Sequence, residues 1–264
     1  MLATATVFSK PTETPVLELK GINKRFGAVQ ALRNVDFEVF PHEVVCVVGD
    51  NGAGKSTLIK VVSGTYRADD GQFLWHGSEV SVARPGDAAA LGIQTVYQDL
   101  ALCDNLDVVS NLFLGRERVR TAVLDEVAME QRAMQVLDDL GVQLPSIRRP
   151  VANLSGGQRQ SVAIARAAMW DAAMVVLDEP TAALGYVQTR MVLRLIKRLR
   201  DRGLGVVLVS HNLDNVFEVA DRIVVLRLGR RVATFAARDA TPERVVRAIT
   251  GADGEDAAIE RTEV

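Results

Sequence analysis

The chain has 264 residues, of which 48% are hydrophobic and 24% are charged, and its formal net charge is −2. This is enough sequence for one large domain or two small ones with a packed core. The balanced charge argues against nucleic acid as the main partner, and no apolar run approaches the roughly 18 residues that a membrane-spanning helix needs.

Residues 1–15 lack both the basic start and the long apolar run of a signal peptide, and their Thr, Pro and Ser residues predict a flexible leader. The two cysteines are Cys46, which lies within an apolar run, and Cys103. A disulfide framework is therefore not expected, and a reducing cytosol fits the composition. We expect the chain to reach a membrane only through a partner.

The first elements are predicted to be strands. A strand begins at 16–19, a turn follows at 24–27, and residues 35–39 alternate apolar with acidic side chains, as in a half-exposed antiparallel strand. Phe26 lies in the predicted turn. An aromatic residue is more often part of a core than of a binding site, but its ring face is also suited to stack on adenine.

The segment Gly49–Thr57 fits the pattern G-x-x-x-x-G-K-[ST] of a phosphate-binding P-loop. It follows an apolar run at 44–48, predicted to be a buried strand, and opens a helix predicted over 56–63. Glycines in such a turn let the backbone wrap around an anion, and the helix N-terminus attracts phosphate. Lys55 is suited to the β- and γ-phosphates and Ser56 to Mg²⁺. A flexible glycine turn with a surface lysine is the alternative, which the flanking strand and helix disfavour.

A hairpin is predicted from residues 72–75 and 79–82, and a β-rich run over 93–97 stops at Gln98. Gln98 has two interpretations at this point. It is either a simple surface amide or a group that reaches Mg²⁺ or an attacking water.

Between about residues 100 and 154 the sequence pattern becomes that of helices. Apolar residues recur at helical spacing around 106–114 and over 127–140, and Gly141 and Pro145 end the second segment. This region interrupts the alternation of strands and helices. It is therefore predicted to be an inserted helical subdomain covering about residues 100–158.

Residues 154–158 read Leu-Ser-Gly-Gly-Gln and precede a helix predicted over 159–169. One interpretation is structural, since Ser155 and Gln158 form a capping box and the two glycines a turn. The other is a second phosphate site, because a hydroxyl, two glycines that allow close approach and a helix N-terminus all suit a γ-phosphate. One chain would then carry two phosphate sites but a single P-loop lysine. The simplest resolution is that the second site faces nucleotide held by another subunit.

The α/β pattern resumes with a buried strand at 174–177, which leads into Asp178 and Glu179. An acidic junction between a strand and a loop is common on its own. Beside a P-loop, however, a carboxylate at the end of a buried strand is the companion Mg²⁺ site, which favours Asp178 as a metal ligand. Glu179 is placed to polarise a water in line with the γ-phosphate.

The remaining predicted elements are a helix over 187–202, buried strands over 206–209 and 223–226, and a strand over 232–235. The helix carries many basic residues, which form either an anion patch or, as we favour, a solvated face opposite the stripe Met191, Leu195 and Leu199. His211 follows a strand at the sheet edge where ligands bind in α/β proteins, although an exposed loop histidine is equally compatible. Residues 251–264 are predicted to be a disordered tail.

These motifs occur in a characteristic order, from Phe26 through the P-loop, Gln98, residues 154–158 and Asp178-Glu179 to His211. In this order the chain resembles the nucleotide-binding subunit of an ABC transporter over about residues 16–235. The resemblance implies an α/β fold, a RecA-like P-loop NTPase core with an N-terminal antiparallel β subdomain and an inserted α-helical subdomain. It implies a nucleotide-binding domain over about residues 16–250.

The resemblance also implies roles for single residues. Nucleotide is bound by Phe26, Gly49, Asp50, Asn51, Gly52, Ala53, Gly54, Lys55, Ser56 and Thr57, and across a dimer by Ser155, Gly156, Gly157 and Gln158. The expected Mg²⁺ ligands are Ser56, Gln98 and Asp178, and the expected catalytic groups are Glu179, His211, Gln98 and Lys55. ATP and Mg²⁺ are the implied cofactors.

The implied partners are a second copy of the chain, in a head-to-tail homodimer around two ATP molecules, and a transmembrane permease. The helical insert and the Gln98 loop are expected to dock the permease, and a periplasmic sugar-binding protein acts indirectly. The chain is then peripheral, on the cytoplasmic face of the inner membrane, and binds no nucleic acid. One departure is Gly185, which stands where the family usually has an aspartate that bridges the dimer.

Residues 23–32, 49–52, 97–102, 111–117 and 181–185 are similar to the monosaccharide-import branch, of the ribose, xylose and fructose type. The expected function is ATP hydrolysis that powers sugar import. One alternative is an ABC ATPase for another solute, such as nucleosides. The other is a soluble ABC protein acting on ribosomes or DNA, but such proteins usually carry paired cassettes or long coiled-coil inserts, which this sequence lacks.

Overall fold

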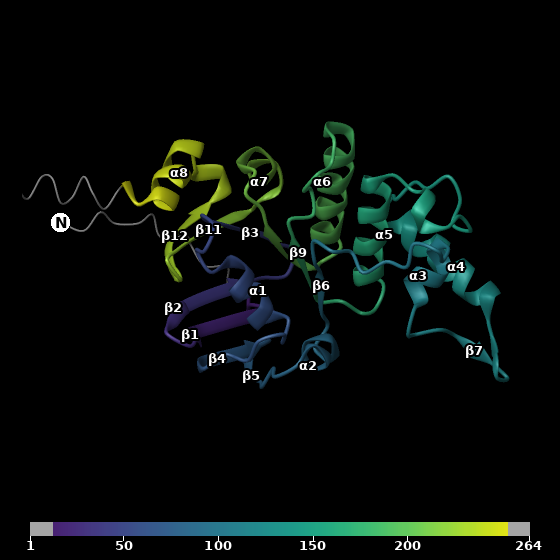
Figure 1. The fold of residues 1–264 in the computed structure, drawn as a ribbon, viewed down its shortest axis with the longest axis horizontal. Helices are drawn as coiled ribbons and strands as arrows, with labels where there is room; N and C mark the ends of the chain where they lie inside the picture. The colour runs from purple at the N-terminus through teal and green to yellow at the C-terminus, as the bar shows by residue number, and fades with distance from the viewer. Residues whose placement is uncertain (1–12, 253–264) are drawn as a thin grey trace, which may run out of the picture.

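In the computed structural model, the described residues are 13–252, so the predicted tail beyond residue 252 and most of the leader lie outside them. These residues form a four-stranded and a six-stranded sheet, with helix α1 (Lys55–Val62) beside both (Figure 1). Helices from the second half of the chain cover the other face of the six-stranded sheet (Figure 1). The elements within residues 108–153 stand at the end of the molecule farthest from the four-stranded sheet (Figure 1).

The four-stranded sheet has the order β2-β1-β4-β5 and is antiparallel throughout. Its strands are β1 (Leu17–Phe26), β2 (Val29–Val39), β4 (Asp70–Trp75) and β5 (Ser78–Glu79). The antiparallel sheet that was expected from the alternating sequence is therefore confirmed.

Two details of the sequence prediction in this sheet were wrong. The segment 24–27 was predicted to be a turn, but β1 continues to Phe26, which pairs with Val29. The reversal is made by only Gly27 and Ala28, and Gly27 adopts the left-handed φ of +57° that a tight turn requires. The second arm of the 72–82 hairpin is also shorter than predicted, because only Ser78 and Glu79 pair with β4.

The six-stranded sheet has the order β12-β11-β3-β10-β9-β6, and only β12 runs antiparallel to its neighbour. Its strands are β3 (Val44–Val48), β6 (Ile93–Val96), β9 (Met174–Asp178), β10 (Gly205–Val209), β11 (Arg222–Arg227) and β12 (Arg230–Ala236). The central strands are buried on both faces, as continuous apolar runs predict. Val45 and Val47 face the core with α1, whereas Val44, Cys46 and Val48 face the core with the other helices.

The remaining helices of the main body are α2 (Pro85–Ala90), α5 (Gly156–Ala168), α6 (Tyr186–Asp201), α7 (Leu213–Val219) and α8 (Pro242–Thr250). Helices α5 and α6 were predicted from the sequence, whereas α2, α7 and α8, which are short, were not. In α6 the predicted stripe is only partly right. Leu195 and Leu199 are buried, but Met191 remains half-exposed, and the buried face is completed by Val192, Leu193 and Ile196.

Between β6 and β9 the chain forms α3 (Val108–Phe113), the small hairpin β7 (Val119–Arg120) and β8 (Val123–Leu124), α4 (Glu126–Asp139) and a single 3₁₀ turn at Val151–Asn153. This part is largely helical, as predicted, but the hairpin was not expected. Within residues 13–252, no helix is both long and apolar enough to cross a bilayer.

Candidate functional site

The carboxyl ends of the parallel strands meet at one edge of the six-stranded sheet. Val96 of β6 pairs with Leu177 of β9, Asp178 pairs with Val209 of β10, and Val209 also pairs with Val47 of β3. Because these strands are parallel and in register, the loops that follow them lie side by side. Those loops carry the predicted site residues Gln98, Glu179, His211 and the P-loop 49–57.

The P-loop connects β3 to α1 in the conformation that its glycines predict. Gly49 has φ +151°, and a Cβ atom there would lie 2.2 Å from the carbonyl oxygen of Leu226. Gly54 has φ +104° and would place a Cβ atom 2.8 Å from the carbonyl oxygen of Ala31. Both positions therefore require glycine. The ammonium group of Lys55 folds back over the loop and donates to the carbonyl oxygen of Gly49 at 2.6 Å.

A cavity of about 460 Å³ opens beside this loop. It is lined by residues 51–57 of the loop and the start of α1, by Val29, Gln30, Ala31 and Arg33 of β2, and by Leu228 and Gly229. Its lining includes seven consecutive residues at a helix N-terminus, where backbone N–H groups and the helix dipole favour a phosphate. The cavity is thus suited to a nucleotide.

Phe26, the predicted adenine-stacking residue, lies at the end of β1. Its ring is 42% exposed and makes an edge-to-face contact with Tyr66, with ring centroids 5.0 Å apart. The Lys24 ammonium lies 5.5 Å from the Phe26 ring centroid. Among the described residues, the cavity lining includes its pairing partner Val29 but not Phe26 itself. Phe26 therefore lies next to the cavity rather than in its wall.

Asp178 is the last residue of β9 and is half-buried. Burial raises the pKa of its carboxyl group, and the nearby ammonium groups of Lys55 and Lys60 act in the opposite direction. The carboxyl group thus lies near enough to the P-loop lysine to interact with it. This neighbourhood is the one that the sequence predicted for Asp178.

Glu179 and His211 form a pair across the ends of β9 and β10. The Nδ1 atom of His211 lies 2.9 Å from Oε2 of Glu179. The side chain of His211 is 74% exposed, whereas that of Glu179 is only 17% exposed. Glu179 adopts the left-handed φ of +49°, which is rare for a residue with a side chain and is typical of functional sites.

Gln98 is exposed and follows β6 after Tyr97. Tyr97 was missed by the sequence analysis. Its hydroxyl group lies 2.9 Å from Oγ of Ser63 and 3.0 Å from Oγ1 of Thr65, just beyond the end of α1. The loop that carries Gln98 is therefore tied to the P-loop helix. No local pattern signals this contact, because the partners are more than 30 residues apart in sequence.

The segment 155–158 starts α5 as a capping box. The backbone N–H of Gln158 donates to Oγ of Ser155 at 3.3 Å, and the backbone N–H of Ser155 donates to Oε1 of Gln158 at 2.9 Å. A Cβ atom at Gly157 would lie 2.8 Å from Cβ of Gln188, so glycine allows α5 to approach α6. Among the described residues that line the P-loop cavity, none comes from 155–158. The structure therefore does not bring this segment to the P-loop of its own chain.

Gly185 is the N-cap of α6 and makes no side-chain capping bond. A Cβ atom at this position would meet nothing within 4 Å. The backbone conformation there, with φ −71° and ψ 166°, is open to any residue. The fold therefore does not require glycine where the resembled family usually has aspartate.

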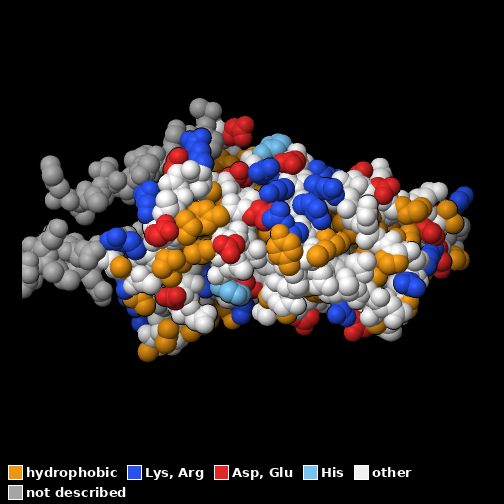
Figure 2. Space-filling view, turned by 90° about the horizontal axis from the view of Figure 1, so that it is seen from above, with side chains coloured by type: hydrophobic (Ala, Val, Ile, Leu, Met, Phe, Trp, Pro, Cys, Tyr) orange, Lys and Arg blue, Asp and Glu red, His pale blue; other side chains and the backbone are white. Residues whose placement is uncertain are grey.

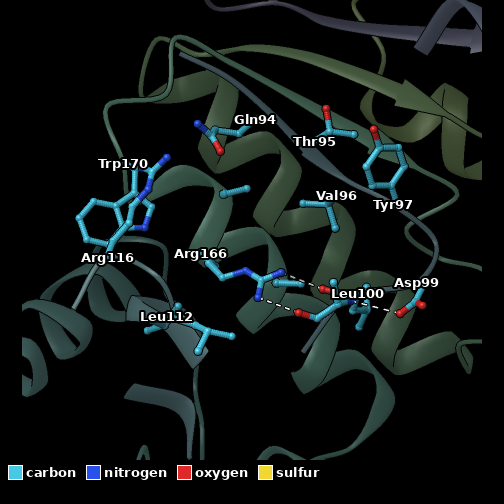
Figure 3. A pocket seen from close by; sticks show the side chains of 14 residues that line it. Gln94, Thr95, Val96, Tyr97, Asp99, Leu100, Leu112, Arg116, Arg166 and Trp170 are labelled. Atoms are coloured by element: carbon cyan, nitrogen blue, oxygen red, sulfur yellow. Dashed lines mark hydrogen bonds between the residues drawn. The ribbon is translucent and has the colours of Figure 1, made fainter. Parts of the chain in front are cut away.

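A second cavity, of about 230 Å³, lies between β6, the loop after it and α5 (Figure 3). The guanidinium group of Arg166 spans the loop and donates to the carbonyl oxygens of Leu100 and Ala101, both at 2.9 Å. Burial lowers the pKa of Arg166. Arg116 lies over the ring of Trp170 at 5.2 Å, at one end of the cavity. The sequence analysis did not identify this cavity, because its walls come from segments up to 76 residues apart (Gln94 to Trp170).

The sequence was compared with protein families and with curated proteins. The ABC transporter family matches residues 32–182. A fructose import ATP-binding protein of Rhizobium meliloti is 46% identical, over 91% of this chain and 95% of that protein. A xylose/arabinose import ATP-binding protein of Sulfolobus acidocaldarius is 44% identical, over 89% of this chain and 94% of that protein. A ribose import ATP-binding protein of Rubrobacter xylanophilus is 45% identical over 90% of this chain, but the match spans only 47% of that longer protein.

Solved structures show the same fold. The crystal structure of the ADP conformation of an ATP-binding cassette of an ABC transporter matches with a TM-score of 0.77 and 26% identity, over 89% of this chain and 95% of that one. A dimeric post-hydrolysis state of another ATP-binding cassette, bound to ADP and Pi, matches with a TM-score of 0.72 and 25% identity, over 85% of this chain and all of that one.

Proposed function

The chain belongs to the ABC transporter family, and from that premise we propose that it is the ATP-binding and ATP-hydrolysing subunit of an importer, energising monosaccharide uptake through a separate membrane permease. The observation that carries ATP hydrolysis is the meeting of the P-loop, Asp178-Glu179 and His211 at one sheet edge. The choice of a monosaccharide rests on the relatives, which are named for fructose, xylose/arabinose and ribose import.

In this proposal ATP is the substrate, and residues 49–57 hold its phosphates. The backbone N–H groups of the loop and the start of α1 point at the phosphate oxygens. Lys55, whose ammonium group already lies over the loop, binds the β- and γ-phosphates as a charge partner. The adjoining cavity, lined by β2 residues, is the proposed place for the rest of the nucleotide, with Phe26 at its border.

The residues present also fit Mg²⁺. Ser56, Asp178 and Gln98 supply a hydroxyl, a carboxylate and an amide oxygen from the same sheet edge, and Mg²⁺ prefers oxygen ligands. The described residues contain no cluster of three or more His, Cys, Asp or Glu side chains that would hold a metal alone. One carboxylate together with substrate phosphates is the usual arrangement for this ion. When bound, Mg²⁺ neutralises charge on the β- and γ-phosphate oxygens.

Glu179 is the proposed general base. Its carboxylate follows β9 directly after Asp178, at the sheet edge that also carries the P-loop. The imidazole of His211, 2.9 Å away, orients that carboxylate. Glu179 then accepts a proton from the attacking water, and the water oxygen bonds to the γ-phosphorus as the bond from that phosphorus to the β–γ bridging oxygen breaks and ADP leaves.

The proposed active unit is a homodimer. Residues 155–158 lie outside the P-loop cavity of their own chain, yet they offer a hydroxyl group and a helix N-terminus. A second copy, placed head-to-tail, brings these groups to the γ-phosphate. Dimeric cassettes of the same fold support this arrangement. Each nucleotide then binds between two chains, and hydrolysis separates them.

The proposed nucleotide-binding domain covers residues 16–250, and its helical insert covers about residues 100–158. The proposed permease contact is formed by this insert together with the second cavity. The cavity lies between β6, an edge strand of the sheet, and α5, and its loop is held by Arg166. The buried amide nitrogen of Gln94, which lines the cavity, has no hydrogen-bond partner within the described structure. A permease segment seated here would be linked, through Tyr97 and Gln98, to the nucleotide site.

The subunit is then peripheral, on the cytoplasmic face of the inner membrane, and a periplasmic sugar-binding protein delivers the substrate.

Transport in a deletion strain tests this function. Uptake of radiolabelled fructose, ribose and xylose is compared with uptake of nucleosides, with the wild-type chain or Glu179→Gln restored. Sugar uptake that requires wild-type Glu179 is the expected result. Uptake of nucleosides alone would reassign the solute. Purification with ribosomes or DNA, rather than with a membrane permease, would contradict a role in transport.

A further inference from the structure

A third cavity, of about 350 Å³, lies between the end of α4, α5 and α6. It is lined by Leu140, Gly141, Val142, Gln143, Ser161, Met191, Arg194, Leu195 and Arg198, none of which belongs to the nucleotide site proposed above. Its volume lies at the small end of the range of small-molecule pockets, roughly 300–1,000 Å³. A small metabolite fits a cavity of this volume.

Two exposed arginines at this cavity have no acidic partner among the described residues. Helix α6 carries five basic side chains, and three of them contact carboxylates: Arg190 and Lys197 contact Glu218, and Arg200 contacts Asp201 and Asp221. Arg194 and Arg198, which line the cavity, have no acidic partner within residues 13–252. Lys and Arg side chains gather over the middle of the face that Figure 2 shows, in the region of α6. The guanidinium groups of Arg194 and Arg198, which have no acidic partner among the described residues, therefore lie together at this cavity.

Arg198 is held in position by the end of α4. Its Nη1 atom donates to the carbonyl oxygen of Leu140 at 2.5 Å. Gly141 has φ +57°, and a Cβ atom there would lie 1.5 Å from the same Nη1 atom, so a larger residue would displace the guanidinium group. The hydrogen bond from Arg198 to Leu140 alone could be explained as a C-terminal cap of α4. However, Arg194 makes no hydrogen bond to any described residue, and a cap does not account for it.

We propose that this cavity binds a small organic phosphate, held by Arg194 and Arg198. Guanidinium groups present paired N–H donors that match phosphate oxygens, and such charge-assisted bonds are strong. Leu195 and Met191 offer apolar surface for the carbon skeleton of the ligand, and Gln143 offers an amide. The ligand class follows from the charge, size and lining of the cavity.

A ligand bound in this cavity links three helices, α4, α5 and α6. The ligand bridges the end of α4 to α6, and Ser161 of α5 forms part of the same wall. The hydroxyl group of Ser161 donates to the carbonyl oxygen of Gly157 at 2.8 Å. Through this hydrogen bond the cavity wall is linked to Gly157 in the first turn of α5, which carries residues 155–158. A bound phosphate restrains this turn relative to α6, so the cavity is a regulatory site.

The test measures binding to the full chain by isothermal titration calorimetry. Fructose 6-phosphate is the probe, and fructose and inorganic phosphate are titrated in parallel. The choice of a sugar phosphate as probe rests on the proposed function, but the readout needs neither ATP nor a permease. The titration is repeated with Lys55→Ala, which removes the P-loop as a competing phosphate site. Fructose 6-phosphate should bind both forms equally, fructose should not bind, and inorganic phosphate should bind more weakly.

Arg194→Gln and Arg190→Gln form a matched pair on the same helix. Arg194 makes no hydrogen bond or ion pair with a described residue, so its variant should fold normally, as thermal unfolding will check. Loss of a charge-assisted contact should weaken fructose 6-phosphate binding by about tenfold or more in Arg194→Gln, with little change in Arg190→Gln.

Three outcomes would overturn the proposal. The first is that fructose 6-phosphate binds to neither form, and the second is that the two arginine variants bind it equally well. In the third, inorganic phosphate binds as tightly as the sugar phosphate, which would show that the cavity does not recognise an organic body. A failure of the transport experiment would leave all of these results unaffected.

Discussion

Glu179 and His211 follow adjacent parallel strands, and His211 Nδ1 contacts Glu179 Oε2 at 2.9 Å. The pairing of Asp178 with Val209 places the two residues next to each other at the sheet edge. The backbone N–H of Glu179 donates to the carbonyl oxygen of Val209 at 3.0 Å, which holds its unusual φ of +49°. Conformations of this kind cost about 1–3 kcal/mol and persist where the surroundings enforce them.

Glu179→Gln should retain ATP binding but lower the rate of hydrolysis by roughly 10²- to 10⁴-fold, because a general base is lost while the shape of the side chain is kept. The variant should accumulate as an ATP-bound dimer, observed by size-exclusion chromatography with multi-angle light scattering. Hydrolysis at the wild-type rate would show that Glu179 is not the base. Asp214→Asn, on the exposed start of α7, is a control that should hydrolyse ATP normally.

Lys55→Ala should weaken ATP binding by about a hundredfold or more, because two charge-assisted contacts to phosphate are lost. Binding is measured with a fluorescent ATP analogue. Lys60→Ala is the matched control, since Lys60 lies on the same helix and its ammonium group stands over the ring of Tyr66 at 5.2 Å. Equal affinity in the two variants would contradict the phosphate-binding role of Lys55.

Ser155→Arg should leave ATP binding by a single chain intact but block formation of the ATP-bound dimer, because a large cation would fill the proposed contact with the second copy. Dimer formation is measured in the Glu179→Gln background. Ser155→Ala controls for the loss of the α5 cap, which should cost about 1 kcal/mol of stability. Normal dimers of the arginine variant would argue against sites shared between two chains.

Asp178→Asn should stabilise the protein near pH 7, because burial raises the pKa of Asp178 and so makes its ionised form unfavourable in the folded state. The loss of folding stability caused by ionised Asp178 is fully present above its raised pKa. It disappears as the pH falls below the ordinary aspartate pKa, because Asp178 is then protonated in both the folded and the unfolded state. The advantage of the variant should therefore fade in acid, as urea unfolding at several pH values will show. A stability difference that does not change with pH would refute this account.

The same substitution should abolish Mg²⁺-dependent hydrolysis, since an amide replaces the proposed carboxylate ligand. Greater stability together with loss of activity is the result expected for a carboxylate that serves function at a cost in stability. If Asp178→Asn is less stable than the wild type and hydrolyses ATP normally, the residue has a structural role instead.

Local motifs were determined by the sequence alone. The P-loop at 49–57, the cap at Ser155 and the carboxylate pair after β9 each depend on a few consecutive residues, whose turns, glycines and caps restrict the backbone by themselves. The two-sided burial of the central strands also follows from their continuous apolar runs. For this reason the fold class and most candidate site residues could be identified before the structure.

Only the tertiary structure decided which of these residues meet. The order of the six-stranded sheet brings Glu179 to His211, and the contact of Tyr97 with Ser63 ties the Gln98 loop to α1. The tertiary structure also leaves Phe26 beside the nucleotide cavity rather than in its wall. The cavity at Arg194 depends on the end of α4 reaching α6, more than 50 residues later. Such contacts join residues distant in sequence, so no local pattern contains them, and they form only when the packed core brings the elements together.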